Sequence, residues 1–338
     1  MPEMRIIHPG PFTTVQDLGR TQSQVAGCPA SGALDRQAAE IGNALVNNRD
    51  EAAVLEFFLQ GPTIYFTHAT YIALTGAQLV ATLDGQTIPM YRCQRVQAGQ
   101  ILTIGQLHAG QVAYLAVSGG VRVPRVLGSR STTTRIQLGG LNGRILESGD
   151  RLPVMQCELM PAYYHRTTEA LPLPDLAEPL RLRILKGPQW SWFDQATQAQ
   201  FINSQYEVTK DADRMGYRLS GPQLPTPDKS MLSAATVFGG IQVPNGGQPI
   251  VLLADRQTTG GYPLIAVLAT VDIRLLAQSR PGQAIQFELI DLEEAQALIR
   301  ERSHSQSQLR QKFHKAYYQA PFGISRVAAY RIQQLFEE

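Results

Sequence analysis

Residues 71–88, YIALTGAQLVATLDGQTI, decide the fold class of this 338-residue chain. Two short apolar runs, Tyr71–Leu74 and Leu79–Leu83, have the length of β-strands rather than of helices. Asp84-Gly85 follows the second run, and this pair is typical of a β-hairpin because glycine supplies the positive φ that a primed turn needs. The stretch therefore predicts antiparallel β-structure.

The same pattern of short apolar runs and glycine-containing turns continues on both sides of this stretch. Thr63–Phe66 precedes it, and Gln100–Ile104 and Val112–Val117 follow it. One turn phrase recurs before alternating segments, which indicates the same β-turn in both halves of the chain and a duplicated β unit. Its copies are Ala98-Gly99-Gln100-Ile101, Ser148-Gly149-Asp150-Arg151-Leu152 and Pro281-Gly282-Gln283-Ala284-Ile285.

The length of the chain favours two domains, because a single core rarely serves more than about 250–300 residues. Pro161, Pro172, Pro174 and Pro179 lie among polar residues, a composition typical of a linker. We therefore expect an N-terminal β domain at residues 1–157, a Pro-rich linker at 158–179, a C-terminal β domain at 180–291 and a helical tail at 292–338.

Few helices are expected. Asp35–Val46 has an apolar face at helical spacing, and Trp192–Ile202 is a second short candidate. Asp291 and Glu294 form a capping pair that predicts the start of a helix running to about Arg302. The polar remainder of the tail predicts a helix that is solvated or docks on a partner.

Composition excludes several classes of protein. Hydrophobic residues make up 43% and charged residues 17%, so the chain can bury cores and is not disordered. A formal net charge of +2 does not favour nucleic acid or an anionic membrane as partner. No secretory leader is recognisable, and the longest apolar stretch, Leu264–Ala269, is far below the about 20 residues that span a bilayer. Cys28, Cys93 and Cys157 lie too far apart for a disulfide framework or a metal site, so we expect a cytoplasmic protein without a metal.

Polar segments rich in glycine recur in both halves, whereas phosphate-loop, nucleophile-elbow and zinc-protease motifs are absent from the sequence. For any one segment a structural ion pair or a simple turn is the plainer explanation. Together they favour a shared cleft between two domains. The segments are 13–20 (TTVQDLGR), 27–36 (GCPASGALDR), 127–132 (LGSRST), 211–218 (DADRMGYR) and 253–263 (LADRQTTGGYP).

The last segment indicates chemistry on an amide. It follows an apolar run that predicts a buried strand, and its two glycines let the backbone approach a ligand closely. An amide substrate needs an acceptor for its N–H, which Asp255 or Asp17 can supply. It also needs a donor for its C=O, which Arg256, Arg20 or the backbone at 260–261 can supply.

At these segments the sequence resembles a known family. TTVQDLGR, GCPASGALDR, LGSRST, DRMGYRL and ADRQTTGGYP are similar to the carboxyltransferase-type family sometimes labelled allophanate hydrolase subunit 2. That family includes the C subunit of bacterial 5-oxoprolinase, the sporulation regulator KipA and the carboxyltransferase region of urea carboxylase. The resemblance extends from about Arg5 to Ala295, and the motifs are long and in order.

The resemblance implies a mainly β fold with two tandem cyclophilin-like β-barrel domains, few short helices and a C-terminal helical tail. The leading functional hypothesis is the C subunit of an ATP-dependent 5-oxoprolinase, which opens 5-oxoproline to L-glutamate together with two partner subunits. Two alternatives remain open. One is a biotin-dependent carboxyltransferase acting on a urea-like amide, and the other is a KipA-like regulatory protein that antagonises a kinase inhibitor.

The resemblance also implies partners, cofactors and a site. The expected partners are a small amide substrate, a KipI-like B subunit, and a LamB/YcsF-like A subunit, with no nucleic acid and no membrane. The chain has no A-M-K-M biotinyl segment and no ATP-binding motif, so ATP would be bound by the complex and biotin would matter only for carboxyl transfer. The residues expected in the cleft are Asp255, Asp17 and Arg20 as catalytic groups, and Ser31, Asp35, Arg130, Asp213, Arg214, Tyr217, Arg256, Gln257, Thr258, Gly260 and Gly261 as substrate-binding groups.

Overall fold

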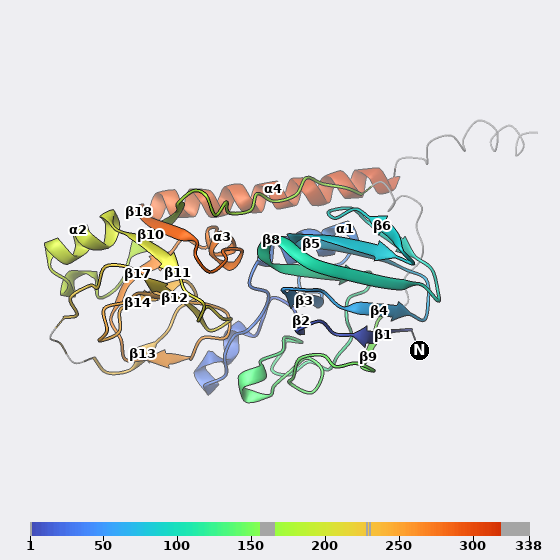
Figure 1. The fold of residues 1–338 in the computed structure, drawn as a ribbon, viewed down its shortest axis with the longest axis horizontal. Helices are drawn as coiled ribbons and strands as arrows, with labels where there is room; N and C mark the ends of the chain where they lie inside the picture. Colours follow the sequence, from blue (N-terminus) through green and yellow to red (C-terminus); the bar gives the residue numbers. More distant parts are fainter. Residues whose placement is uncertain (1, 156–165, 228, 230, 319–338) are drawn as a thin grey trace, which may run out of the picture.

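The computed structural model describes residues 2–155, 166–227, 229 and 231–318. Two β-rich halves lie side by side, and one long helix, α4, crosses both of them (Figure 1). We call residues 2–155 the N-terminal half and residues 180–291 the C-terminal half. Predictions for the first part of the linker, 156–165, and for the end of the tail, 319–338, lie outside the described residues. None of the described helices is both long enough and apolar enough to span a membrane.

The N-terminal half is built on one nine-stranded sheet of order β2-β3-β8-β4-β1-β9, with β5 pairing β6, β7 and β8. The two apolar runs of residues 71–83 form a single strand, β5. Its pairing register with β8 shifts just after Gly76, which has a φ of +91°. The runs around residues 101–117 likewise merge into one long strand, so the predicted breaks are irregularities within strands. The strands are β1 (Glu3–His8), β2 (Phe12–Gln16), β3 (Val54–Phe58), β4 (Thr63–Phe66), β5 (Thr70–Leu83), β6 (Gln86–Ile88), β7 (Gln94–Val96), β8 (Ile101–Val117) and β9 (Arg151–Pro153).

Two turn predictions are confirmed. Asp84 and Gly85 have φ values of +47° and +82° and connect β5 to β6 as a hairpin. Gly99, Gly149 and Gly282 have φ values of +91°, +90° and +91°, and each donates its N–H to a carbonyl at the end of a neighbouring strand. The repeated phrase is therefore one turn used three times, twice in the N-terminal half and once in the C-terminal half.

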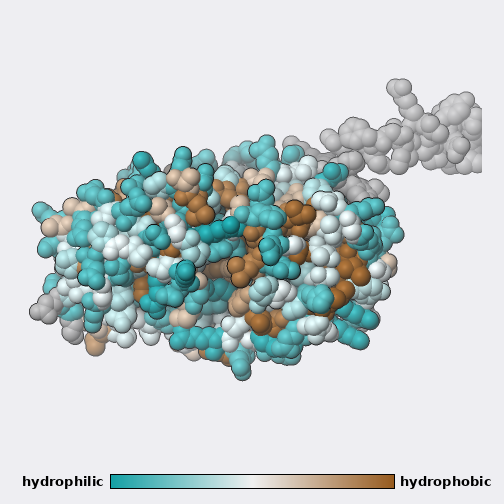
Figure 2. Space-filling model, viewed as in Figure 1, coloured by the Kyte–Doolittle hydropathy of each residue, from teal (hydrophilic) through white to brown (hydrophobic). Residues whose placement is uncertain are grey.

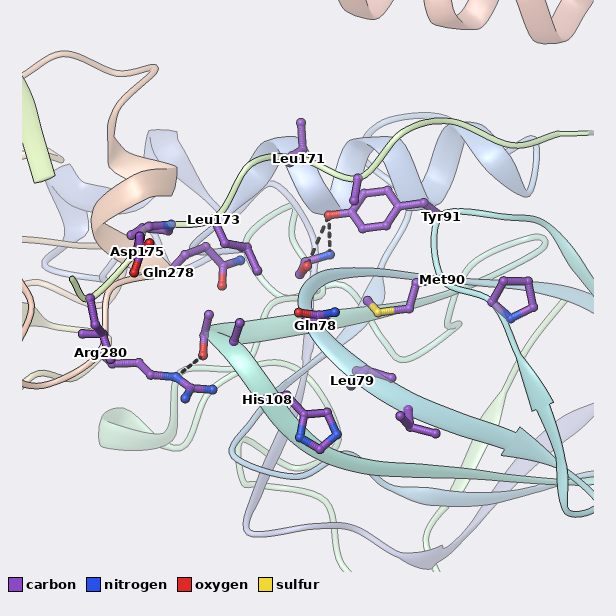
Figure 3. A pocket seen from close by; sticks show the side chains of 18 of the residues that line it. Gln78, Leu79, Met90, Tyr91, His108, Leu171, Leu173, Asp175, Gln278 and Arg280 are labelled. Atoms are coloured by element: carbon purple, nitrogen blue, oxygen red, sulfur yellow. Dashed lines mark hydrogen bonds between the residues drawn. The ribbon is translucent and has the colours of Figure 1, made fainter. Parts of the chain in front are cut away.

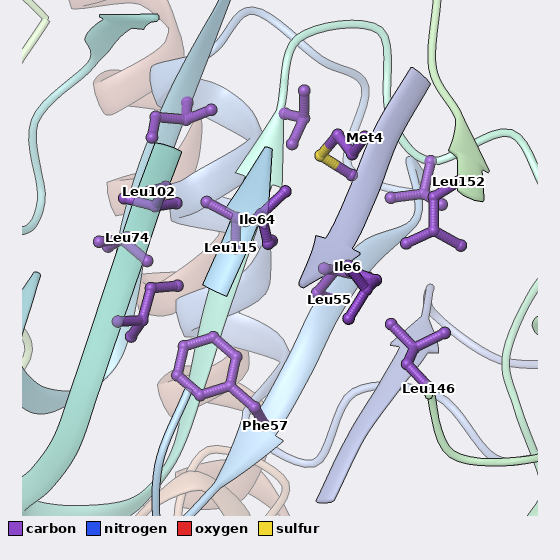
Figure 4. Packing of buried hydrophobic residues seen from close by; sticks show 14 of the residues in the cluster. Met4, Ile6, Leu55, Phe57, Ile64, Leu74, Leu102, Leu115, Leu146 and Leu152 are labelled. Carbon is purple, nitrogen blue, oxygen red and sulfur yellow. The ribbon is translucent and has the colours of Figure 1, made fainter. Parts of the chain in front are cut away.

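The larger core of the N-terminal half lies on one face of its sheet, and a second core packs α1 (Arg36–Leu45) against the other face. Strands β1, β3, β4, β5 and β8 supply the aliphatic side chains of the larger core, and Figure 4 shows them interdigitating. Alternate residues of each strand point into this layer, as the period of two requires. The labelled members are Met4, Ile6, Leu55, Phe57, Ile64, Leu74, Leu102, Leu115, Leu146 and Leu152.

The C-terminal half is a closed seven-stranded barrel of order β10-β17-β14-β15-β12-β11-β18, closed by the parallel pair β10 and β18. The expected mainly β fold is confirmed. Among the described strands, pairing closes this second sheet, whereas the first sheet ends at β2 and β9. Two further strands, β13 and β16, form a small sheet of their own. The strands of this half are β10 (Leu180–Lys186), β11 (Gln205–Val208), β12 (Gly216–Ser220), β13 (Ala234–Ala235), β14 (Gly240–Gln242), β15 (Ile250–Leu252), β16 (Thr259–Gly260), β17 (Leu264–Leu268) and β18 (Ala284–Leu289).

The helices are few, as expected, but their bounds differ from the prediction. The second helix starts at Gln195 rather than near Trp192, because Asp194 caps it by accepting from the N–H of Thr197 at 2.7 Å. The short α3 was not predicted. The helices are α1 (Arg36–Leu45), α2 (Gln195–Asn203), α3 (Ile273–Ala277) and α4 (Leu292–Tyr318), with 3₁₀ turns η1 (Thr21–Ala26), η2 (Thr134–Ile136) and η4 (Trp190–Trp192).

The capping pair before α4 is confirmed, since the N–H of Glu294 donates to Asp291 at 2.8 Å and the reverse bond is 3.0 Å. The predicted end of α4 near Arg302 is wrong. The helix continues to Tyr318 because it contains no glycine or proline and packs against the N-terminal half. Phe313 is 4% exposed in a core shared with α1.

Helix α4 ties the two halves together. It starts directly after the last strand of the barrel and then runs along the N-terminal half beside α1 (Figure 1). Arg302 forms an ion pair with Glu40 of α1 at 2.8 Å, and Arg310 donates to the carbonyl of Asn48 at 3.0 Å. The part of the tail that is described therefore docks on the chain itself.

Two loops of the N-terminal half cross where the halves meet. The N–H of Ala33 donates to the carbonyl of Asp17 at 2.9 Å, and a Cβ on Gly32 would lie 2.9 Å from the N atom of Gly19. Gly32 also has a φ of +97°. Only glycine fits such a crossing, because both the backbone conformation and the space exclude a side chain.

We expect Gly32→Ala to lower the free energy of unfolding by more than Gly128→Ala. Both positions have a positive φ, which costs alanine about 1 kcal/mol, but a Cβ at Gly128 meets nothing within 4 Å. The clash at Gly32 adds about 1–3 kcal/mol. Urea unfolding of the two variants measures the difference, and equal losses would contradict the tight crossing.

Candidate active site between the two halves

The guanidinium of Arg214 joins the two halves. Its Nε donates to Oδ2 of Asp255 at 2.8 Å, and its Nη2 donates to Oδ1 of the same carboxylate at 3.2 Å. Nη2 also donates to the carbonyl of Gly32 at 2.8 Å, and Nη1 contacts Oε1 of Glu56. One side chain of the C-terminal half therefore holds a carboxylate of each half.

Regular elements fix these groups in place. Glu56 lies on β3, Arg214 in the turn between β11 and β12, and Asp255 just after β15. The N–H of Asp255 donates to the carbonyl of Arg214 at 2.8 Å, so the two backbones are paired as well. Asp213 orders the turn by accepting from the N–H groups of Met215 at 2.7 Å and Gly216 at 3.1 Å.

The polar network extends from Glu56 across the N-terminal half. Oε2 of Glu56 accepts from the hydroxyl of Tyr114 at 2.8 Å, and that hydroxyl accepts from the N–H of Asp35 at 2.8 Å. Asp35 caps α1 and accepts from Nε2 of Gln278 at 2.9 Å. Since Gln278 follows α3 in the C-terminal half, the network crosses the boundary twice.

The other end of the network lies at Asp255. Oδ1 accepts from the hydroxyl of Thr133 at 3.3 Å, and Thr133 contacts the hydroxyl of Ser31. The N–H of Ser31 donates to the carbonyl of Ala254 at 2.9 Å, and Ser31 has a φ of +54°. We call Ser31, Glu56, Thr133, Arg214 and Asp255 the seam site.

Burial sets the electrostatics of the seam site. Burial alone would lower the pKa of Arg214, but the carboxylates of Asp255 and Glu56 outweigh it and raise that pKa above its ordinary value. Burial raises the pKa of Glu56, although Arg214 and two hydrogen-bond donors oppose the shift. The pKa of Asp35 is raised by burial too.

Asp17, Arg20 and Arg130 form a separate cluster in the N-terminal half. Asp17 accepts from the hydroxyls of Ser129 and Ser131, both at 2.6 Å, and from the N–H of Arg130 at 2.6 Å. Arg20 contacts the carbonyl of Ser131, and Nε of Arg130 donates to the carbonyl of Val123 at 2.9 Å. These groups hold the loop that ends in Thr133 of the seam site.

The remaining residues expected in the cleft lie apart from the seam site or on its rim. Tyr217 is buried in the barrel, where its hydroxyl donates to the carbonyl of Ala277 at 3.2 Å. Arg256 is buried directly after Asp255, Gln257 is exposed, and Thr258 is half-buried. Gly260 pairs with β13, next to the exposed Gly261.

Sequence reasoning missed four members of the network, namely Glu56, Tyr114, Thr133 and Gln278. Glu56 is a lone acid in the apolar run Val54–Phe58, and a charge in a buried strand is an informative signal. Thr133 directly follows the segment LGSRST. Gln278 carried no signal, because a glutamine after a short helix is ordinary in sequence.

An open pocket of about 820 Å³ lies between the halves on another side of Gln278. Figure 2 shows a hollow at the boundary with hydrophobic side chains beside it, and Figure 3 shows the lining side chains. Two of its polar side chains already have partners. Arg280 donates to the carbonyls of Gly110 and Leu107, both at 2.9 Å, and Tyr91 bonds to Gly76. The pocket thus offers few free polar groups for an amide.

No cluster of three or more His, Cys, Asp or Glu side chains in the described part of the chain could hold a metal ion. The chemistry available at the seam site is that of carboxylate acceptors, guanidinium and hydroxyl donors in a desolvated setting. Such a site suits recognition of a group with an N–H and a C=O.

Comparison with known proteins agrees with the segments that build this site. Residues 26–289 match the family described as "Carboxyltransferase domain, subdomain A and B". The chain belongs to this family. The match covers both halves, so the carboxyltransferase family fold includes the whole seam site, and the resemblance found in the sequence is confirmed.

Relatives within the carboxyltransferase family include 5-oxoprolinase subunits. The chain is 40% identical over 312 residues to the 5-oxoprolinase C subunit of Escherichia coli, covering 92% of this chain and 99% of the relative. It is 37% identical to the 5-oxoprolinase C subunit of Haemophilus influenzae, covering 88% of this chain and 94% of the relative. Urea amidolyase of Saccharomyces cerevisiae is 32% identical over 87% of this chain, but only 17% of its own length is covered.

Solved structures give the same result. The urea carboxylase of Kluyveromyces lactis superposes with a TM-score of 0.81 at 29% identity, covering 91% of this chain and 29% of that chain. The urea amidolyase of K. lactis gives 0.80 at 30% identity, covering 91% of this chain and 20% of that chain. This chain therefore corresponds to one part of those longer proteins.

The raised pKa of Glu56 predicts a pH-dependent stability. Folding favours its protonated form, so the stabilising contribution is fully present below the ordinary value of 4.5 and is lost as pH rises through the raised pKa. Glu56→Gln does not titrate. The unfolding free energy of the wild type relative to Glu56→Gln should therefore fall as pH rises above 4.5 and through the raised pKa of Glu56.

Urea unfolding at a series of pH values measures this difference. Glu51→Gln, at an exposed position in the same half, serves as the matched control. A wild-type advantage over Glu56→Gln that stays constant across the range would show that burial does not control this carboxyl.

Proposed function

We propose that this chain is the C subunit of an ATP-dependent 5-oxoprolinase and contributes the seam site to hydrolysis of 5-oxoproline to L-glutamate. The observation that carries the proposal is the 40% identity to a 5-oxoprolinase C subunit over 99% of that relative's length. The match extends along the whole length of the relative, which supports a shared role in addition to a shared fold.

Asp255 is the proposed acceptor for the lactam N–H. Its Oδ2 is engaged by Nε of Arg214 at 2.8 Å, whereas its Oδ1 has longer bonds of 3.2 Å and 3.3 Å. Oδ1 therefore has the weaker internal partners and more capacity to accept a further hydrogen bond. Asp255 is 8% exposed, so its carboxylate lies at the edge of the buried network rather than in its centre.

The rim after Asp255 supplies proposed donors for the lactam C=O. Gln257 and Thr258 lie two and three residues after Asp255 and reach solvent, and the backbone at Gly260 and Gly261 lies in the same segment. Hydrogen-bond donors aimed at this oxygen would stabilise the negative charge that develops on it during hydrolysis.

The other residues expected in the cleft have positioning roles in this proposal. Arg214 and Ser31 hold Asp255 and Thr133, and Asp35 links the same network to α1. Support from further away comes from groups that fix loops or the barrel, namely Asp17, Arg20, Arg130, Asp213 and Tyr217.

Partners and cofactor complete the proposal. The chain would act with two further proteins, a KipI-like B subunit together with a LamB/YcsF-like A subunit, and ATP would be bound by the assembled complex. Both halves would be cyclophilin-like domains at residues 1–157 and 180–291, joined by a linker at 158–179 and followed by a tail at 292–338. The lactam would then lie between the two domains.

Carboxyl transfer to a urea-like amide is the second candidate. The TM-score of 0.81 with urea carboxylase supports it, because the same architecture serves that longer protein. Urea and a lactam both present an amide N–H and C=O, so the seam site suits either substrate. This function would need biotin and ATP-using partners on other chains.

The test of the main proposal is glutamate release from 5-oxoproline with ATP by the chain and its two proposed partners. Omission of any one of the three proteins should abolish release. Asp255→Asn, which keeps the size of the side chain, should lower turnover by at least about 100-fold, the scale expected when a key acceptor is lost. Gln257→Ala, on the exposed rim, should raise KM with an intact fold.

Thermal unfolding of each variant separates loss of the site from loss of the fold. Both Asp255→Ala and Asp255→Asn remove one charge of a buried ion pair, which destabilises by about 3–5 kcal/mol. Asp255→Asn is the better choice because its amide oxygen can still accept from Arg214 and its size leaves no cavity. Full activity in folded Asp255→Asn would refute the assigned acceptor. No glutamate from an assembled complex would refute the function.

A further inference from the structure

Two arginines at the boundary of the halves, Arg36 and Arg256, form no ion pair with a carboxylate of the described residues. Arg36 is the first residue of α1 in the N-terminal half, and Arg256 follows β15 in the C-terminal half. Arg256 is only 5% exposed. The buried Nε atom of each guanidinium has no hydrogen-bond partner in the described part of the chain. Among the described residues, the one hydrogen bond of the Arg256 guanidinium runs from Nη1 to the carbonyl of Leu253 at 3.2 Å.

Both arginines contact the same aromatic ring. The guanidinium carbon of Arg36 lies 5.2 Å from the centre of the Phe238 ring, and that of Arg256 lies 5.7 Å from it. The ring brings the two cations close together and stabilises each, but it supplies no full negative charge. Burial, with the neighbouring Arg36 as a second cause, lowers the pKa of Arg256 to about 10.

The nearest carboxylates are engaged elsewhere. Glu40, one turn along α1, forms its ion pair with Arg302 at 2.8 Å. Asp17 accepts from two serine hydroxyls and two backbone N–H groups. Arg214 differs from these two arginines, because it forms ion pairs with a carboxylate of each half. The positive charge at Arg36 and Arg256 is therefore not balanced by hydrogen-bonded carboxylates of the described chain.

Arg36 lies at the start of α1, where the partial positive charge of the helix N-terminus is met by the capping carboxylate of Asp35. A narrow gap of about 10 Å³ beside Arg36 and Phe238 is also lined by Arg274 and Arg302, but not by Arg256. A gap of this size holds about one water, so an oxyanion shared by Arg36 and Arg256 requires both side chains to turn toward it.

We propose that Arg36 and Arg256 form a binding site for one oxyanion, a carboxylate or a phosphate group, with Phe238 as its apolar wall. Planar guanidinium groups suit both oxyanions, since each can donate two parallel hydrogen bonds. Two sources fit this chemistry. One is the carboxylate of 5-oxoproline, a choice that rests on the proposed function. The other is a free phosphate, which does not.

The location makes the first source chemically reasonable. Arg256 is adjacent in sequence to Asp255, although the two side chains form no hydrogen bond or ion pair with each other. A ligand that reached both side chains would present an N–H to Asp255 and a carboxylate to Arg256. 5-Oxoproline carries both groups on one five-membered ring. Pyrrolidin-2-one has the same lactam without the carboxylate, and inorganic phosphate has the charge without the lactam.

Calorimetric titration of the full chain with these three compounds tests the proposal. We expect inorganic phosphate, L-5-oxoproline or both to bind, and Arg36→Gln and Arg256→Gln each to weaken that binding at least tenfold. Arg218→Gln, an exposed arginine on β12, should leave it unchanged. Tighter binding of 5-oxoproline than of pyrrolidin-2-one would identify the substrate carboxylate as the occupant, and binding of phosphate alone would identify phosphate.

The unfolding temperature provides the control for folding. Each Gln variant removes one charge from a buried like-charged pair, so its unfolding temperature without ligand should stay equal or rise. Binding that is the same in all variants, or no binding of either oxyanion, would overturn the proposal. The outcome is separable from the proposed function. If phosphate binding depends on the two arginines but the complex releases no glutamate, the oxyanion site is supported and the proposed activity is refuted.

Discussion

The contact of one guanidinium with three groups at once is the constraint on which the rest of the structure depends. Arg214 binds Asp255 of its own half, and Glu56 and the carbonyl of Gly32 from the other half. Breaking such a buried pair costs about 3–5 kcal/mol, because the remaining charge has no solvent. We call these contacts of Arg214 with Asp255, Glu56 and Gly32 the polar lock. The polar lock and α4 together hold the two halves in one arrangement.

Several local features follow from that lock. The 30–34 loop must reach the barrel, which explains the glycine-against-glycine crossing and the positive φ of Ser31. Asp17 is used to order the loop carrying Thr133 rather than to face solvent. Because the network continues through Tyr114 to Asp35 and Gln278, a shift between the halves would break hydrogen bonds at both ends.

Features that depend on local backbone conformation were predicted correctly from the sequence. Asp84-Gly85, the repeated Gly99-type turn and the Asp291–Glu294 cap depend on backbone conformation and near neighbours, and each was found as expected. The end of α4 was missed because it depends on Phe313 packing against a distant half. Ser31, Arg214 and Asp255 were expected together from their polar segments. Glu56 and Gln278 joined them only through tertiary contacts.

The most direct test of the polar lock separates the charge of Arg214 from its shape. Arg214→Lys keeps a cation but cannot bond Asp255, Glu56 and the Gly32 carbonyl together. The measurement is the turnover number of the reconstituted complex, with the folded state of the variant checked by circular dichroism. We predict a folded chain whose turnover falls at least about 100-fold because Asp255 is no longer held in place. Wild-type turnover in Arg214→Lys would contradict the role of the lock in the reaction.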